Sequence, residues 1–129
     1  MKDTALPLVY ACSGCSSVAQ LANDSALRLD REGRAQMSCI SGVGGGVASL
    51  VRLAQSGRPI LALDGCALAC VQACLQQAGV VADQHLVLNR AGARKRLHDA
   101  ASEDEAALAW QAVEQGLQQL LLQFERKEW

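Results

Sequence analysis

The sequence predicts an α/β fold: a three-layer, Rossmann-like domain with a mostly parallel sheet of about four strands and a C-terminal amphipathic helix. Short apolar runs alternate with stretches of helical periodicity, which is the pattern of a sheet covered by helices on both faces. The connections have the length that right-handed crossovers between parallel strands require. A chain of 129 residues can also bury a core without disulfide bonds, so we treat residues 1–129 as a single domain.

Four short apolar runs bounded by turn residues predict the strands, at residues 6–11, 35–40, 59–64 and 85–89. The first, LPLVYA, is apolar enough to be buried on both faces. The second, AQMSCI, is weaker because Gln36 and Ser38 interrupt its apolar pattern. The third, PILALD, is the clearest strand in the chain, and HLVLN completes the sheet.

Helical spacing of apolar residues predicts four helices, at residues 18–30, 47–55, 67–78 and 102–126. Ser16 or Ser17 can cap the first helix, and Gly79 ends the third. Ser102 and Glu105 have the spacing of a capping box at the start of the last helix. The apolar stripe of that helix packs on its own sheet in the simpler interpretation, and forms the contact of a homodimer in the alternative.

Charge and aromatic content argue against two large classes of partner. Twelve basic and thirteen acidic residues give a formal charge of -1, which provides no general attraction to nucleic acid or to an anionic membrane. Two Trp, one Tyr and one Phe offer no platform on which bases could stack. The basic cluster is short and is interpreted as solvated surface; it consists of Arg90, Arg94, Lys95 and Arg96.

The beginning of the chain does not have the pattern of a secretion signal or a lipid anchor. The apolar stretch from Ala5 to Ala11 is short, Pro7 interrupts it, and Tyr10 is bulky for a cleavage site. No apolar run reaches the ~20 residues that a membrane span needs. We therefore expect a cytoplasmic protein, in which thiols stay reduced and six cysteines indicate metal or redox chemistry instead of disulfide bonds.

Three cysteines stand where a predicted strand ends: Cys12, Cys39 and Cys66. The carboxyl ends of parallel strands meet at one edge of a sheet, so we expect these thiols to converge there. Cys15 forms a C-x-x-C turn with Cys12, and Cys70 follows Cys66 by four residues, which places both on one face of the predicted helix.

A thiol-rich edge suits a single metal ion, and Zn²⁺ takes four tetrahedral ligands and accepts thiolates readily. Helix N-termini at the same edge offer partial positive charge that favours thiolates. Since coincidence would otherwise have to act at three strand ends, we expect four ligands, which are Cys12, Cys39, Cys66 and Cys70. Cys15 and Cys74 are possible additional ligands, although Cys74 lies a turn further into the helix and is more simply a small buried hydrophobe.

Other residues near this edge have simpler interpretations. The loop SGVGGG lets the backbone approach the strand ends, and Val47 breaks its match to a dinucleotide-binding loop. Asp64 caps the following helix or orients a cysteine ligand through a hydrogen bond. His85 and His98 have no Cys or carboxylate pattern nearby and are interpreted as surface or internally satisfied histidines.

Three motifs together resemble the DGC-domain family of zinc-binding proteins: CSGCSSVAQLAND, MSCISGVGGGV and ILALDGCALACVQACLQQAGV. The resemblance covers about residues 8–98, and the family takes its name from the Asp-Gly-Cys sequence at residues 64–66. It implies zinc ligands at the same four cysteines that were selected above. The chain departs from many relatives at Cys15 and Cys74, where they lack cysteine, and at Ala67, where proline is usual.

A zinc ion enclosed by four thiolates has no open position for a water molecule, which predicts a structural or sensing role without hydrolysis. The alternative is a redox protein that uses the same cysteines, with an iron-sulfur cluster or with Cys12 and Cys15 as a dithiol-disulfide pair. An enzyme with Cys12 as nucleophile would need a base, and the sequence pairs none with it. We expect a binding protein; an enzyme would be a thiol-dependent oxidoreductase.

Overall fold

The computed structural model describes residues 6–127 and the side chains up to Glu125. The interpretation of the beginning of the chain as lacking a secretion signal therefore lies outside the described residues where it concerns residues 1–5. Its four strands form one parallel sheet in the order β2-β1-β3-β4. The strands are β1 (Leu8–Ala11), β2 (Gln36–Met37), β3 (Ile60–Asp64) and β4 (Gln84–Val87). β2 has two residues, fewer than the predicted 35–40, since the chain enters α2 at Ile40 with Cys39 as its N-cap residue.

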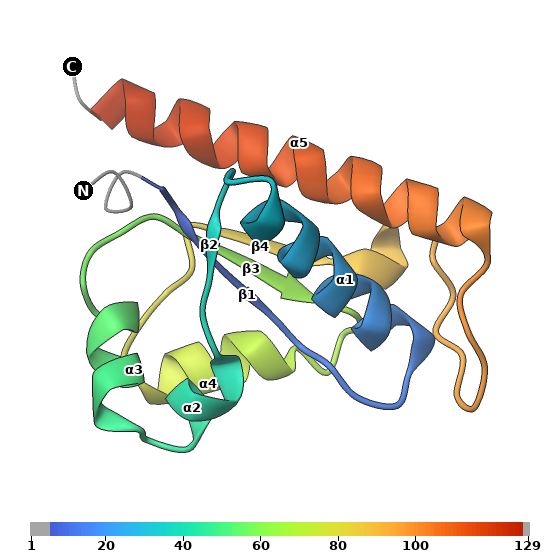
Figure 1. The fold of residues 1–129 in the computed structure, drawn as a ribbon, viewed down its shortest axis with the longest axis horizontal. Coiled ribbons are helices and arrows are strands. Elements are labelled where there is room, and N and C mark those ends of the chain that lie inside the picture. Colours follow the sequence, from blue (N-terminus) through green and yellow to red (C-terminus); the bar gives the residue numbers. More distant parts are fainter. Residues whose placement is uncertain (1–5, 128–129) are drawn as a thin grey trace.

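The helices are α1 (Ser17–Arg31), α2 (Ile40–Gly44), α3 (Ala48–Ala54), α4 (Cys70–Gln77), the 3-10 helix η2 (Leu88–Ala91) and α5 (Glu103–Lys127). Figure 1 shows α1 and α5 together on one face of the sheet, with α2, α3 and α4 on the other. The predicted three-layer α/β fold with its C-terminal helix is therefore confirmed.

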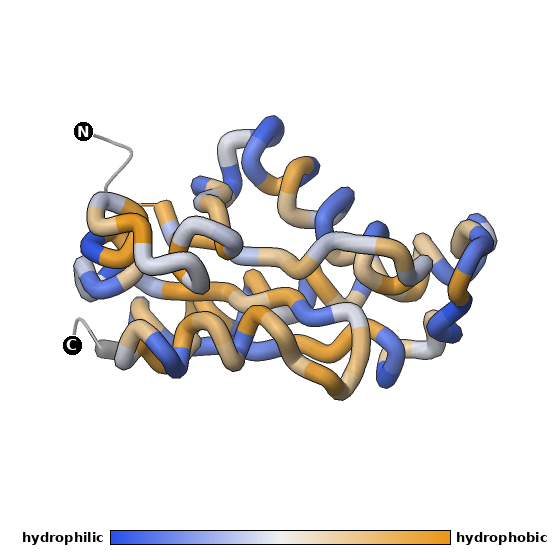
Figure 2. Tube along the Cα trace, turned by 90° about the horizontal axis from the view of Figure 1, so that it is seen from below, coloured by the Kyte–Doolittle hydropathy of each residue, from blue (hydrophilic) through white to orange (hydrophobic). Residues whose placement is uncertain are grey.

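The core has two parts, one on each face of the sheet. Because side chains alternate along a strand, Val9 and Ala11 point toward α1 and α5, whereas Leu8 and Tyr10 point toward α2, α3 and α4. β1 and β3 are buried along their whole length, as central strands covered on both faces should be. The interior strands are mostly apolar and the outer loops are mostly hydrophilic (Figure 2).

α5 packs on its own sheet, as the simpler interpretation predicted. Its buried side chains join the core on the α1 side, and they include Ala109, Val113, Leu117 and Leu120. Leu108, Leu121 and Leu122 on the same helix are exposed, so the homodimer stays a prediction. Within residues 6–127, no helix is both long enough and apolar enough to cross a membrane.

The structure corrects the prediction at two helices. Ser41 to Gly44 of the predicted loop SGVGGG belong to α2, in which Gly42 packs against the Leu50 side chain of α3, whereas Gly45 and Gly46 form a turn after the helix. The helix predicted from Ala67 begins only at Cys70, because Ala69 has the left-handed backbone conformation with φ 53°. Cys66 therefore precedes the helix, and it does not share a helix face with Cys70.

Candidate functional site

Cys66 and Cys70 lie close enough to Cys12, near the carboxyl ends of β1 and β3, for their charges to act on its thiol; we call Cys12, Cys66 and Cys70 the thiol cluster. The Cys12 backbone N–H donates to the Leu63 carbonyl over 3.1 Å, which continues the pairing of β1 with β3. Its sulfur accepts a hydrogen bond of 3.2 Å from the Gly65 N–H. Burial raises the pKa of the Cys12 thiol, and the negative charges of Asp64, Cys70 and Cys66 raise it further.

Gly65 allows this arrangement because it has no side chain. A Cβ atom at this position would lie 2.6 Å from the carbonyl carbon of Val18 and 2.7 Å from the backbone nitrogen of Ala19. The Gly65 carbonyl also accepts a 3.0 Å hydrogen bond from the N–H of Asn89 in η2. The glycine of the Asp-Gly-Cys sequence is thus held against the first turn of α1, which begins shortly after Cys12.

Asp64 caps α4, which was the more favoured of its two predicted roles. It is 1 % exposed, and its carboxylate accepts hydrogen bonds from the backbone N–H groups of Val71 at 2.8 Å and Gln72 at 3.2 Å. These are N–H groups of the first helical turn, which have no partner within the helix. The carboxylate therefore fixes where α4 begins, and with it the position of Cys70 at the helix N-terminus, where negative charge is favoured.

His85 is internally satisfied, as predicted, but its partner was not foreseen. Its Nε2 atom is hydrogen-bonded to the Asp64 carboxylate at 2.8 Å. The pairing of β3 with β4 explains this contact, since Ala62 lies opposite His85 and Asp64 lies two residues further along the same face. The alternation of side chains on two neighbouring strands was the signal that could have identified the pair.

Cys74 is half-buried between two helices. A Cβ atom on Gly44 of α2 would lie 2.8 Å from its sulfur, so the two helices are in close contact at this point. Burial raises the pKa of the Cys74 thiol, and the charges of Cys70 and Asp64 add to the effect. These surroundings suit a small packing residue.

Cys39 and Cys15 are exposed. Cys39 immediately precedes α2, and its sulfur lies 3.5 Å from the Ser41 hydroxyl. Hydrogen bonds from the Ser41 side chain and the Gly42 backbone lower the pKa of the Cys39 thiol. Among residues 6–127, no three His, Cys, Asp or Glu side chains are close enough to hold one metal ion, so the predicted ligand set is only partly gathered in this arrangement.

The loop after η2 brings a lysine to the thiol cluster. Lys95 Nζ donates to the Cys66 sulfur at 3.5 Å, although 29 residues separate the two in sequence. Arg90, Arg94 and Lys95 are exposed, as the interpretation of the basic cluster as solvated surface predicted, and the half-buried Arg96 pairs with Glu105. The position of this loop depends on the contacts of its backbone with Glu105 and with Ser17, which lies 77 residues before Arg94, and the sequence pattern could not reveal them.

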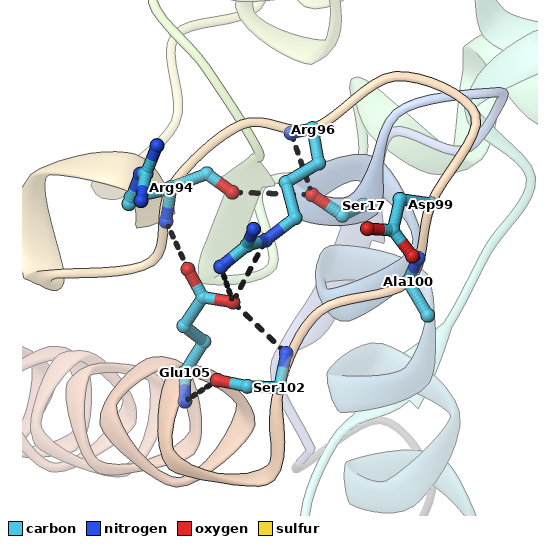
Figure 3. Close-up of polar contacts among 7 residues, drawn as sticks. All are labelled: Ser17, Arg94, Arg96, Asp99, Ala100, Ser102 and Glu105. Atoms are coloured by element: carbon cyan, nitrogen blue, oxygen red, sulfur yellow. Dashed lines mark hydrogen bonds and ion pairs between the residues drawn. The ribbon is translucent and has the colours of Figure 1, made fainter.

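The Glu105 carboxylate accepts hydrogen bonds from both ends of this loop, at Arg94 and at Ser102 (Figure 3). The predicted capping box is confirmed: Ser102 Oγ accepts from the Glu105 N–H at 3.1 Å, and Glu105 Oε1 accepts from the Ser102 N–H at 2.9 Å. The same carboxylate accepts from the Arg94 N–H at 2.8 Å and pairs with the Arg96 guanidinium at 3.1 Å. Hydrogen bonds from the Ser102 and Arg94 backbones, with a smaller contribution from Arg96, lower the pKa of Glu105 to about 2.

The donor chemistry of the thiol cluster fits a soft metal ion. Thiolates select Zn²⁺ or iron-sulfur clusters over the harder Mg²⁺ and Ca²⁺. The nearby helix N-terminus and Lys95 add positive charge at this edge of the sheet.

Comparison with known proteins finds similarity over most of the chain, including the residues of the thiol cluster. The profile of a family described as the DGC domain matches residues 8–113, which extends the expected resemblance past residue 98 and into α5. A protein of Pseudomonas aeruginosa named "Anaerobic and virulence modulator AnvM" is 62% identical over 104 residues, which cover 81% of this chain and 79% of the relative. No solved structure matches the chain.

Proposed function

Since this chain belongs to the DGC-domain family, we propose that it is a zinc-binding protein whose cysteine thiolates hold the metal in a structural or sensing role. The observation that supports this proposal is the proximity of Cys66 and Cys70 to Cys12, whose sulfur accepts a hydrogen bond from the Gly65 N–H. Their donor atoms come from two strand ends and one helix start, and Cys39 stands at the end of the neighbouring strand.

We propose as ligands the four cysteines that were predicted from the sequence: Cys12, Cys39, Cys66 and Cys70. Because no three of the described side chains are close enough for one ion, binding requires a rearrangement. Cys39 is the ligand with most freedom to move, since it is exposed and lies between a two-residue strand and a five-residue helix. Asp64 would support the site from outside, by holding the start of α4 in place.

A regulatory role fits these features better than catalysis. When bound, four thiolates would leave the zinc ion no open position, so the ion would supply a cross-link or a signal instead of an activated water. The name of the relative, "Anaerobic and virulence modulator AnvM", supports the same direction. The reduced thiols that such a site needs are those of the cytoplasm, where we place the protein.

Elemental analysis tests the proposal directly. The untagged protein is purified anaerobically, and a visible absorption spectrum is recorded on the same sample. About one zinc per chain without a visible band is the expected result, because a Zn-thiolate site has no colour. Iron with sulfide absorption bands would overturn the zinc assignment in favour of the redox alternative. A protein that holds no metal and takes up none under anaerobic conditions would overturn metal binding altogether.

A further inference from the structure

We propose that Lys95 is a charge-balancing residue of the thiol cluster, and that the contacts of Glu105 and Ser17 position it there. The inference rests on the proposed metal site and goes beyond it, because it adds a residue that is not a ligand and assigns it an effect on metal affinity.

The first argument is the way in which the backbone around Lys95 is held on both sides. Before it, the Arg94 N–H donates to Glu105 at 2.8 Å, and the Arg94 carbonyl accepts from the Ser17 hydroxyl at 3.1 Å. After it, the Arg96 N–H donates to the Ser17 hydroxyl at 2.8 Å, and the Arg96 carbonyl accepts from the Ser17 N–H at 2.9 Å. Figure 3 shows three of these contacts, which join the loop to Glu105 at the start of α5 and to the Ser17 hydroxyl of α1. The backbone of Lys95 is therefore fixed although its side chain is exposed.

The second argument is the choice of partner. The neighbouring Arg96 guanidinium is already paired with Glu105 at 3.1 Å. Lys95 Nζ instead donates to Cys66 Sγ at 3.5 Å, so within the described basic cluster the lysine is the cation in contact with a thiol. An ammonium group has three donors and no acceptor, so it favours a sulfur that carries negative charge.

The third argument is the charge at this edge of the sheet. A zinc ion with four thiolates carries a net charge of about -2, and the buried Asp64 adds a further negative charge within range of Cys12. Such a centre needs nearby positive charge. The N-terminus of α4 supplies part of it at Cys70, and Lys95 supplies a full unit charge at Cys66.

Three substitutions of Lys95 test the role, with zinc affinity of the full chain measured by competition against a chromophoric chelator under anaerobic conditions. Since exposed charge contacts have modest effects, we expect Lys95→Met to weaken zinc binding about threefold and Lys95→Glu about tenfold. Lys95→Arg keeps the charge and should bind within about twofold of the wild type. The differences should shrink as ionic strength rises from about 0.02 M to about 0.5 M.

Arg31→Met is the matched control for net charge. Arg31 is exposed and lies at the far end of α1, about 20 Å along the helix axis from Ser17. We expect zinc affinity to be unchanged in this variant, and the melting temperature of the metal-free protein to be the same for both methionine variants.

Glu105→Gln tests the positioning. It keeps the side-chain size and removes the charge that holds the loop, so zinc affinity should fall as it does for Lys95→Met. The double variant of Glu105→Gln and Lys95→Met should bind zinc no more weakly than Lys95→Met alone, because both changes act through the same contact.

Equal zinc affinity of wild type, Lys95→Met and Lys95→Glu would overturn the inference while leaving the zinc site intact. So would a loss in Arg31→Met that matches the loss in Lys95→Met, or a failure of Lys95→Arg to retain affinity. A wild-type protein that binds no zinc would overturn both the inference and the proposed function.

Discussion

Gly65 lies so close to Val18 that a Cβ atom on the glycine would be 2.6 Å from the valine carbonyl carbon. This contact is between two backbones, so no side-chain rotation can relieve it. It joins the end of β3 to the first turn of α1, and the Gly65 N–H at the same point donates to the Cys12 sulfur. One small residue therefore holds together the two chain segments that carry Cys12 and Cys66.

Gly65→Ala should destabilise the protein strongly, by about 3 kcal/mol or more in the free energy of unfolding, because overpacking against a backbone forces the elements apart. Urea unfolding measures the change. Gly44→Ala is the control, since its new Cβ would meet the Cys74 sulfur at 2.8 Å and that side chain can move. An equal or smaller loss for Gly65→Ala than for Gly44→Ala would contradict this account.

Single serine variants should separate the ligands from the packing cysteine. We expect Cys39→Ser and Cys70→Ser each to lose bound zinc, because a hydroxyl is a poor replacement for a thiolate ligand. Cys74→Ser should keep it, since Cys74 packs against Gly44. Zinc content per chain after purification decides the matter. Full zinc in the first two variants would remove those residues from the proposed ligand set.

Acid should abolish the stability that Glu105 contributes. Its pKa is lowered to about 2 in the folded protein, so its contribution is complete above the ordinary glutamate pKa of about 4.5 and is lost as pH falls from there toward 2. At pH 7 the melting temperature of Glu105→Gln should lie below that of the wild type. The gap should narrow steadily below pH 4.5. A gap that is the same at pH 7 and pH 2.5 would mean that the charge of Glu105 does not stabilise the loop.

Thiol reactivity in the metal-free protein should follow exposure and pKa. Cys39 is exposed and its pKa is lowered, so iodoacetamide should modify it faster at neutral pH than Cys12 or Cys74, whose pKa values are raised by burial. The ratio of rates should decrease at alkaline pH, as all three thiols ionise. Mass spectrometry of the alkylated peptides measures the order, and faster modification of Cys74 than of Cys39 would refute it.

The features that the sequence predicted correctly are those that depend on local pattern. The alternation of strands and helices led to the parallel sheet, and the spacing of Ser102 and Glu105 led to a capping box that the structure confirms. The start of α4 could not be predicted in this way, because Asp64 caps it from a strand end six residues earlier and Ala69 adopts a left-handed conformation. Helical periodicity alone predicted a start at Ala67, which is three residues too early.

The candidate site was predicted in outline and not in its contacts. The rule that parallel strand ends meet at one edge predicted the neighbourhood of Cys12 and Cys66. It could not predict that Cys39 would stay exposed and outside the group of charges that act on Cys12. Lys95 was missed for a different reason: its approach to Cys66 depends on how Glu105 folds back the loop, and no spacing along the chain encodes that.

The family match ends at residue 113, which is midway along α5, whereas the helix continues to Lys127. Leu117 and Leu120, beyond that boundary, belong to the same core cluster as Val9 and Leu61 of the central strands. Burial of such a leucine contributes about 1.5–3 kcal/mol, so a chain cut after Val113 would lose a substantial part of its stability. The folding unit is thus longer than the shared sequence unit. If the end of α5 from one family member were joined to the sheet of another, the chimera would fold only where the transferred leucines pack against that sheet.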